Sequence, residues 1–213
     1  MLQRLLTRKT YSPVFSNDCD AMPKHVLQLL PIVLAVLVSG CNGLNFREVE
    51  PGALYVSGQA TPEQFDRLHA RYNFRTVVNL RGPHEGSQWY AYERATARRK
   101  GIRYVDLDIS RRRGPTPDDL ARLHAILDDE DRHPIYAHCW AGSDRAGLVA
   151  AVYRIRHLGW ENEAALERMF HHGYGTHLFP RLAEFVRGYP DDVGHEGAES
   201  RKETEEGGTD ERG

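Results

Sequence analysis

The stretch HCWAGSDRAG, residues 138–147, decides the fold of this chain. A short apolar run, Pro134 to Ala137, precedes it, and a helix-like run, Leu148 to Leu158, follows it. The pattern predicts a strand that leads through a tight loop into a helix. Such a loop can wrap a phosphate, because its backbone N–H groups point inward and the helix N-terminus adds partial positive charge.

Two residues of this loop carry the predicted chemistry. Cys139 opens the loop, and Arg145 closes it six positions later. The guanidinium group of Arg145 offers a planar, bidentate grip on phosphate oxygens. The same positive field favours the thiolate form of a cysteine, so Cys139 is predicted to be a nucleophile.

The loop resembles the signature of the cysteine-dependent protein tyrosine and dual-specificity phosphatases, His-Cys-(five residues)-Arg. Residues 46–59, FREVEPGALYVSGQ, are similar to the opening of bacterial members, and residues 75–81, RTVVNLR, are similar to their next strand. The resemblance extends over residues 46–188. It implies a phosphatase that hydrolyses phosphate monoesters through a phosphocysteine intermediate, most of all on phosphotyrosine or dual-specificity substrates, without a metal or another cofactor.

The resemblance also assigns roles within the loop. His138 orients it, and the phosphate is bound by Trp140, Ala141, Gly142, Ser143, Asp144 and Arg145. The side chain of Trp140 could stack on a substrate ring, although a tryptophan at such a position more often packs into the core.

Ala146 departs from the family pattern, which has Ser or Thr directly after the arginine. That hydroxyl steadies the cysteine thiolate as it leaves the phosphocysteine intermediate. Ser143 is the loop hydroxyl that could replace it. The departure suggests a slow second step, and it makes a phosphate-binding pseudoenzyme one alternative.

Three aspartates compete for the role of the general acid that protonates the leaving oxygen. Asp144 is preferred, because lipid-phosphatase-like and myotubularin-like relatives with Asp-Arg at this point use the loop aspartate. Asp108 is second: it lies 31 residues before Cys139, near where dual-specificity relatives carry the acid on a movable loop. Asp106 is third.

Residues 110–115, SRRRGP, are expected to overhang the site with a charge that suits an anionic substrate. Together with Asp144, these arginines suggest a second alternative, an inositol-phosphate or lipid phosphatase. A redox or sulfur-transfer protein built around Cys139 is the weakest alternative, because Arg145 and Gly142 would then have no purpose.

Strand and helix patterns alternate early in the chain, and helices cluster late. We therefore expect an α/β fold with a small central, mainly parallel sheet flanked by helices. Strands are predicted at residues 54–56, 75–80, 103–109 and 134–138, and helices at 62–72, 88–100, 145–158, 161–171 and 177–187, with a further helix that starts at Thr116. The site then lies at the carboxyl end of a strand, where open α/β sheets bind ligands.

The N-terminal region is typical of an export signal that directs a protein to a membrane. An apolar run, residues 27–38, leads through two small residues to Cys41, and LVSGC looks like a bacterial lipobox. We expect residues 22–40 to be a lipoprotein signal peptide, residues 1–21 to be an upstream extension, and Cys41 to be lipidated. The protein would then be exported and lipid-anchored to a bacterial membrane on the periplasmic side, and Asn42 favours the outer membrane.

Charge is distributed unevenly along the 213 residues. The phosphatase domain is placed at residues 41–190. Residues 191–213 carry nine acidic against three basic residues and are expected to form a disordered acidic tail. Nucleic acid is not an expected partner, since Arg111–Arg113 is too short a basic run. The expected partners are a phosphorylated protein, an inositol phosphate or a phospholipid as substrate, and a membrane. The histidines show no convincing spacing for metal ligands.

Overall fold

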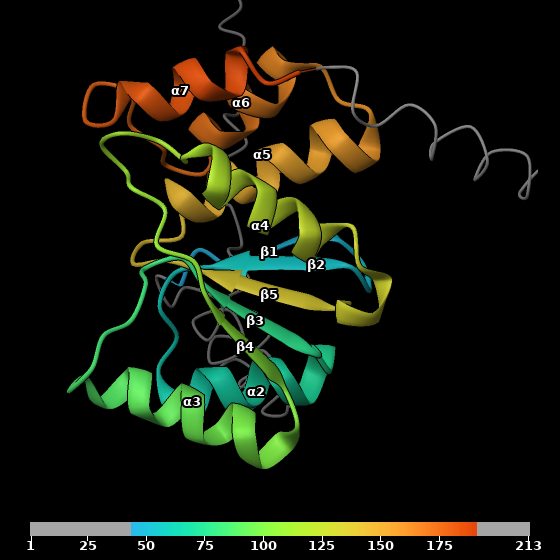
Figure 1. Ribbon diagram of the computed structural model, residues 1–213, viewed down its shortest axis with the longest axis vertical. Coiled ribbons are helices and arrows are strands. Elements are labelled where there is room, and N and C mark those ends of the chain that lie inside the picture. Colours follow the sequence, from blue (N-terminus) through green and yellow to red (C-terminus); the bar gives the residue numbers. More distant parts are fainter. Residues whose placement is uncertain (1–43, 191–213) are drawn as a thin grey trace, which may run out of the picture. The chain divides into compact units, whose positions relative to one another are not determined.

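A five-stranded sheet forms the centre of the structure, a computed structural model that describes residues 44–190 (Figure 1). The strand order is β1-β2-β5-β3-β4, and all neighbours are parallel except β1 and β2. The strands are β1 (Arg47–Glu50), β2 (Leu54–Ser57), β3 (Thr76–Asn79), β4 (Arg103–Asp106) and β5 (Ile135–His138). The predicted small, mainly parallel sheet is therefore confirmed.

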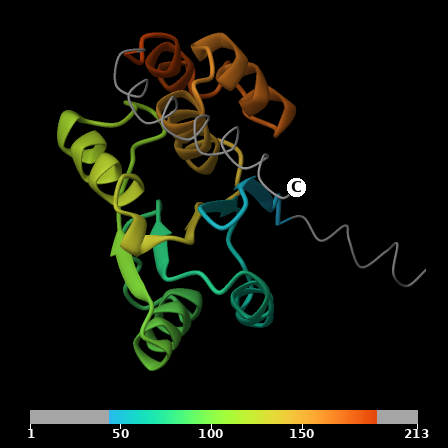
Figure 2. The ribbon, with the colours of Figure 1, turned by 90° about the vertical axis from the view of Figure 1, so that its right-hand side faces the viewer.

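Helices cover both faces of this sheet. Figures 1 and 2 show two helices on one face, α2 (Pro62–Tyr72) and α3 (Gln88–Lys100). The other face carries α4 (Pro117–Leu127), α5 (Arg145–Leu158), α6 (Asn162–His171) and α7 (Pro180–Arg187), and a short 3₁₀ helix, η1 (Glu130–Arg132), precedes β5. This arrangement confirms the predicted α/β class with flanking helices.

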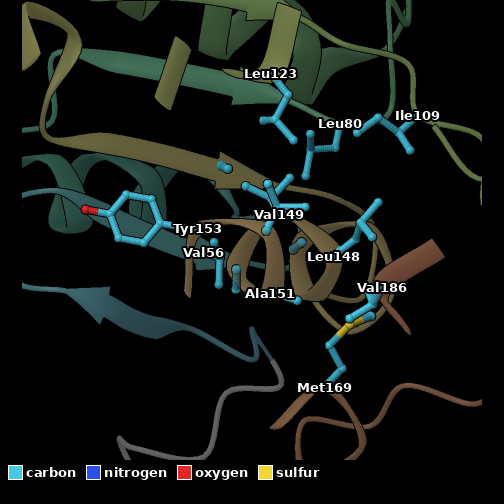
Figure 3. Close-up of a cluster of buried hydrophobic side chains, with 14 of the residues drawn as sticks. Val56, Leu80, Ile109, Leu123, Leu148, Val149, Ala151, Tyr153, Met169 and Val186 are labelled. Atoms are coloured by element: carbon cyan, nitrogen blue, oxygen red, sulfur yellow. The ribbon is translucent and has the colours of Figure 1, made fainter. Parts of the chain in front are cut away.

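Helix α5 lies at the centre of the larger core. Its residues from Arg145 to Ile155 are all buried, so it is apolar around most of its circumference. Figure 3 shows Leu148 and Val149 of α5 among side chains from the sheet and from its neighbouring helices, including Leu80, Leu123 and Met169. Burial of a side chain of this size contributes about 1.5–3 kcal/mol, so the core holds the start of α5 firmly beneath the site.

The predicted helix starts are confirmed at two places. Thr61 caps α2: its hydroxyl accepts a hydrogen bond from the Gln64 backbone N–H, and its own backbone N–H donates one to Gln64 Oε1. Thr116 and Asp119 form the same reciprocal pair at α4. In both helices proline occupies the first turn, where its missing N–H is not needed.

Two predicted boundaries are wrong, and one strand was missed. The strand predicted at 103–109 ends at Asp106, because its partner β3 ends at Asn79 and the ladder stops there. Asp108 is therefore outside the strand. The helix predicted at 177–187 begins at Pro180, where the ring fixes the backbone for a first turn. Strand β1, which pairs with the edge of β2, was not predicted.

The targeting predictions fall outside the described residues. The upstream extension, the signal peptide, lipidation at Cys41 and the acidic tail concern residues 1–43 and 191–213. Among residues 44–190, no helix has both the length and the hydropathy that a bilayer crossing requires.

Candidate active site

Strand β5 delivers Cys139 to the carboxyl edge of the sheet, between β2 and β3. The Cys139 amide donates to the Ser57 carbonyl at 3.2 Å, and the side chain is almost fully buried. The Gly142 amide donates to the Cys139 sulfur at 3.3 Å. Residues 139–145, called the Cys139 loop below, thus fold back so that a backbone N–H points at the sulfur, an arrangement that stabilises negative charge there.

Gly142 is needed at its position for two reasons. Its φ of +78° lies in the left-handed region, which residues with a Cβ rarely adopt. A Cβ there would also come within 2.5 Å of the Gly58 amide nitrogen. The Gln59 amide donates to the Trp140 carbonyl at 3.0 Å from the same side. The loop therefore packs backbone against backbone on the end of β2.

Arg145, the first residue of α5, is anchored at the base of the site. Its Nη1 donates to the Leu80 carbonyl at 2.7 Å, and only 8% of the residue is exposed. Burial lowers the pKa of Arg145, the nearby Cys139 sulfur raises it, and Arg111 lowers it further. A guanidinium group that is desolvated, oriented and close to a sulfur is well placed to hold a phosphoryl group above that sulfur.

Arg47 stabilises the Cys139 loop through hydrogen bonds, a role that was not predicted from the sequence. Its Nη2 donates to the Gly142 carbonyl at 2.6 Å, and its Nη1 donates to Asn45 Oδ1 at 2.8 Å. Asn45 in turn donates to the Ala141 carbonyl at 3.3 Å. Burial, and then repulsion from Arg154, lower the pKa of Arg47 to about 10. In the sequence Arg47 is only a basic residue within a short extended segment. No local pattern indicates its contact with Gly142.

The side chain of His138, which is predicted to orient the loop, lies against Glu93 of helix α3. Its Nε2 lies 3.1 Å from Glu93 Oε2, at the distance of an ion pair but without the angle of a hydrogen bond. Both side chains are almost completely buried. Glu93 also accepts from Tyr104 Oη at 2.8 Å and from Gln59 Nε2 at 2.7 Å. Glu93 was not among the predicted site residues, because it lies on α3, 45 positions before His138, and no local pattern indicates their contact.

The structure places Asp144 within the Cys139 loop, next to Arg145. The residue is only 9% exposed, and burial raises the pKa of its carboxyl, whereas a hydrogen bond from Ser143 lowers it. The carboxylate makes no capping hydrogen bond to α5. A buried carboxyl with a raised pKa is more often protonated, as a proton donor must be.

The other two aspartates are placed differently. Asp108 is exposed, and its charge raises the pKa of Arg145, which places it near the same end of the loop. Asp106 accepts from Tyr90 Oη at 2.7 Å and from Asn79 Nδ2 at 2.8 Å. Because its oxygens are engaged at the sheet edge, Asp106 is the least available of the three.

The hydroxyl expected beside the sulfur is not supplied by Ser143. Its Oγ lies 3.3 Å from Asp144 Oδ1, and within residues 44–190 the hydrogen bond to the Cys139 sulfur comes from Gly142. Ala146 is fully buried in the core.

A pocket of about 370 Å³ opens above the loop and is called the arginine pocket below. It is lined by Arg81, His84, Arg111, Trp140 and Arg145. Arg111 brings the 110–115 segment to the site, as predicted. Trp140 is 66% exposed, so the expectation that it packs into the core is wrong. Its side chain lies at the rim of the pocket.

No cluster of three or more His, Cys, Asp or Glu side chains that could hold a metal ion occurs in residues 44–190.

The sheet is mainly parallel, and its central strand leads into a loop that begins with a cysteine and is closed by an arginine at a buried helix. This combination defines the fold and site of the cysteine-dependent phosphatases. A family model described as "DSP-PTPase phosphatase fused to NAD+ Kinase" matches residues 30–177. The match covers more than half of the chain, which therefore belongs to this family.

Individual relatives agree with this assignment. The dual specificity protein phosphatase TpbA of Pseudomonas aeruginosa is 36% identical over 97 residues, which cover 45% of this chain and 44% of TpbA. The match thus spans less than half of that relative's length. The crystal structure of P. aeruginosa TpbA has a TM-score of 0.57 at 28% identity, and the alignment covers 73% of this chain and 91% of TpbA.

The core catalytic domain of the PP-IP phosphatase SIW14 from S. cerevisiae is similar in fold. Its TM-score is 0.58 at 22% identity, and the alignment covers 76% of this chain and 93% of that domain. A likeness at this identity shows the common fold.

Proposed function

We propose that this protein hydrolyses phosphate monoesters through a phosphocysteine intermediate on Cys139, with phosphotyrosine or other phosphorylated residues of proteins as the substrate class. One observation carries the proposal: the Cys139 sulfur accepts a backbone N–H in a loop that the buried Arg145 closes. The relative TpbA, a dual specificity protein phosphatase, supports the substrate class.

In the first step the Cys139 thiolate attacks phosphorus, and a phosphorus–sulfur bond forms as the ester phosphorus–oxygen bond breaks. The electron pair leaves with the ester oxygen, which takes a proton from a carboxylic acid. Arg145 and the loop N–H groups stabilise the charge on the phosphoryl oxygens in the transition state. Arg145 and the loop N–H groups thus supply the charge stabilisation that a metal ion supplies in other phosphatases. We therefore propose a metal-independent reaction.

In the second step a water molecule attacks phosphorus and the phosphorus–sulfur bond breaks. Inorganic phosphate leaves, the thiolate is restored, and the carboxylate formed in the first step accepts the water's proton. We assign the acid to Asp144 before Asp108, because Asp144 is buried, has a raised pKa and lies within the Cys139 loop. With alanine at 146, this second step lacks a hydroxyl donor to the departing sulfur and is expected to be slow.

Turnover of para-nitrophenyl phosphate tests the proposal. The native protein should release nitrophenol, and chelation with EDTA should not change the rate. Cys139→Ser should abolish turnover while the melting temperature stays near that of the native protein. A native protein that binds phosphate but never turns over would instead be the pseudoenzyme that Ala146 suggests, and turnover by Cys139→Ser would exclude the cysteine mechanism.

We also propose that the protein is exported and lipid-anchored through Cys41, on the periplasmic side of a bacterial membrane. The lipobox-like LVSGC ending at Cys41 supports this location. Expression from Met22 in a bacterium with lipoprotein machinery should give a membrane-bound product whose mature N-terminus is a lipidated Cys41. Mass spectrometry of that N-terminus decides the point: an unmodified Cys41 in the membrane fraction contradicts it, and Cys41→Ala serves as the control.

A further inference from the structure

The arginine pocket holds more positive charge than one phosphoryl group needs. Arg145 belongs to the Cys139 loop, but Arg81 and Arg111 come from separate segments that converge on the same opening. None of the five lining residues is acidic. The volume of the pocket, about 370 Å³, is also larger than a single phosphoryl group fills.

Arg81 is held in place before any ligand arrives. Its Nη1 donates to Gln59 Oε1 at 2.9 Å. Its guanidinium carbon lies 4.2 Å from the ring centroid of Trp89 and 4.9 Å from that of Trp140, so the group is in contact with both indoles. An arginine fixed in this way loses little conformational entropy when it binds an anion.

The position of Gln59 is itself determined by a buried group. Its amide nitrogen donates to Glu93 Oε1 at 2.7 Å, so the amide oxygen is turned toward Arg81. Glu93 is only 2% exposed. A buried carboxylate on α3 therefore fixes, through one amide, the orientation of an arginine at the pocket.

Within residues 44–190, no acidic side chain forms an ion pair with Arg81, whose guanidinium group contacts the Gln59 side-chain amide and the two indoles. Burial, and then repulsion from Arg145, lower the pKa of Arg81, while Glu93 and the Cys139 sulfur raise it. Asp108 and Asp144 are the acids that act on neighbouring Arg145. An anion between Arg81 and Arg145 would relieve their repulsion.

We propose that Arg81, together with Arg111, forms a second anion subsite that binds a further phosphoryl group of the substrate, next to the one held by the Cys139 loop. This inference rests on the proposed phosphatase activity but not on its protein substrate class, and it favours substrates with two phosphoryl groups close together. Arg81 is then a specificity-determining residue, and Gln59 positions it.

Calorimetric titration of the Cys139→Ser protein tests the subsite without turnover. Inorganic phosphate probes the loop alone, and inorganic pyrophosphate probes the loop and the subsite together. Pyrophosphate should bind at least about tenfold more tightly, since hydrogen bonds to a charged group contribute about 1.5–3 kcal/mol. Arg81→Met in the same background should remove most of this preference. Gln59→Leu, which keeps the arginine but frees it, should remove part of it.

Arg67→Met is the matched control, because Arg67 is an exposed residue of α2 outside the pocket lining and the change in net charge is the same. It should leave the preference unchanged. Equal affinity for the two anions, or a preference that survives Arg81→Met, would overturn the subsite while leaving the phosphatase proposal intact. Failure of both anions to bind would overturn the two together.

Two arrangements of neighbouring phosphoryl groups share this chemistry, an anhydride and a pair of esters on adjacent carbons. Titration with 2,3-bisphosphoglycerate separates them. Tighter binding than pyrophosphate, lost on Arg81→Met, supports the subsite with esters on adjacent carbons as the source. Tighter binding of pyrophosphate than of 2,3-bisphosphoglycerate, lost on Arg81→Met, supports the subsite with an anhydride as the source.

Discussion

The floor and the rim of this site are built in different ways. The floor is the Cys139 loop, whose backbone is held by hydrogen bonds from Cys139 to Ser57 and from Gly142 to the sulfur, and by Arg47 from behind. The rim consists of side chains from three separate segments, among them Arg81 and the exposed Trp140. Backbone geometry defines the floor, and side-chain contacts define the rim.

This difference separates the groups that stabilise the transition state from the groups that select the substrate. A substitution in the floor moves the backbone groups that stabilise the transition state, so it should affect every substrate. A substitution at the rim changes which group is held beside the reacting phosphate, so its effect should depend on the substrate. The two regions can therefore be told apart by the size and the substrate dependence of the losses.

The largest loss is expected for Arg145→Lys in the floor. A lysine keeps the charge but presents a single ammonium group, which cannot both donate to Leu80 and grip two phosphate oxygens. We expect kcat/KM for para-nitrophenyl phosphate to fall by about 10²–10³-fold. Steady-state kinetics measure this loss. A loss below tenfold would mean that a positive charge at position 145 is sufficient, without the two-oxygen contact of the guanidinium group.

Gly142→Ala should come next. The residue would have to adopt a φ of +78°, with its Cβ 2.5 Å from the Gly58 nitrogen, so the loop must shift away from β2. Left-handed backbone costs about 1–2 kcal/mol for a residue with a Cβ, before the overlap is counted. Thermal unfolding should show this loss of stability, and activity should drop with it. The control is Gly86→Ala, where φ is +86° and a Cβ meets nothing within 4 Å; equal losses in both variants would show that backbone strain rather than packing against β2 matters.

Ala146→Thr is expected to act in the opposite direction. A hydroxyl beside Arg145 could donate to the departing sulfur, a bond worth about 1.5–3 kcal/mol, or about tenfold or more in rate when made only in the transition state. Breakdown of the phosphocysteine should quicken, and the initial burst of nitrophenol should shrink in stopped-flow measurements. Because Ala146 is fully buried, stability is measured alongside. An unchanged burst with a slower steady state would contradict this role for the missing hydroxyl.

The smallest effect is expected from Arg111→Met at the rim. The positive charge of Arg111 lowers the pKa of Asp144, so its removal should raise that pKa further. The acid then stays protonated to higher pH, and the alkaline limb of the kcat/KM profile should move to higher pH. A limb that moves to lower pH would exclude Asp144 as the donor.

The floor could be predicted from the sequence because its determinants are local. Cys139, Gly142 and Arg145 lie within seven residues, and the strand before them and the apolar helix after them set the geometry. The caps at Thr61 and Thr116 were predictable for the same reason, since each needs only its own first turn.

The remaining parts of the site depend on contacts between distant segments. Arg47 donates to Gly142 across 95 positions, and Glu93 on α3 lies 3.1 Å from His138 at the end of β5. Asp108 was placed in a strand because its sequence alternates, but the length of the neighbouring strand determines where pairing ends. The choice between Asp144 and Asp108 also stays a prediction, because both lie close enough to act on Arg145.

The most direct measurement is acid quenching of the protein during turnover, followed by mass spectrometry of the peptide that contains Cys139. With slow breakdown of the intermediate, the native protein should carry one added phosphoryl group on Cys139, and Cys139→Ser should carry none there. Active turnover with no phosphoryl group on Cys139, or with the group on another residue, would contradict a reaction through phosphocysteine.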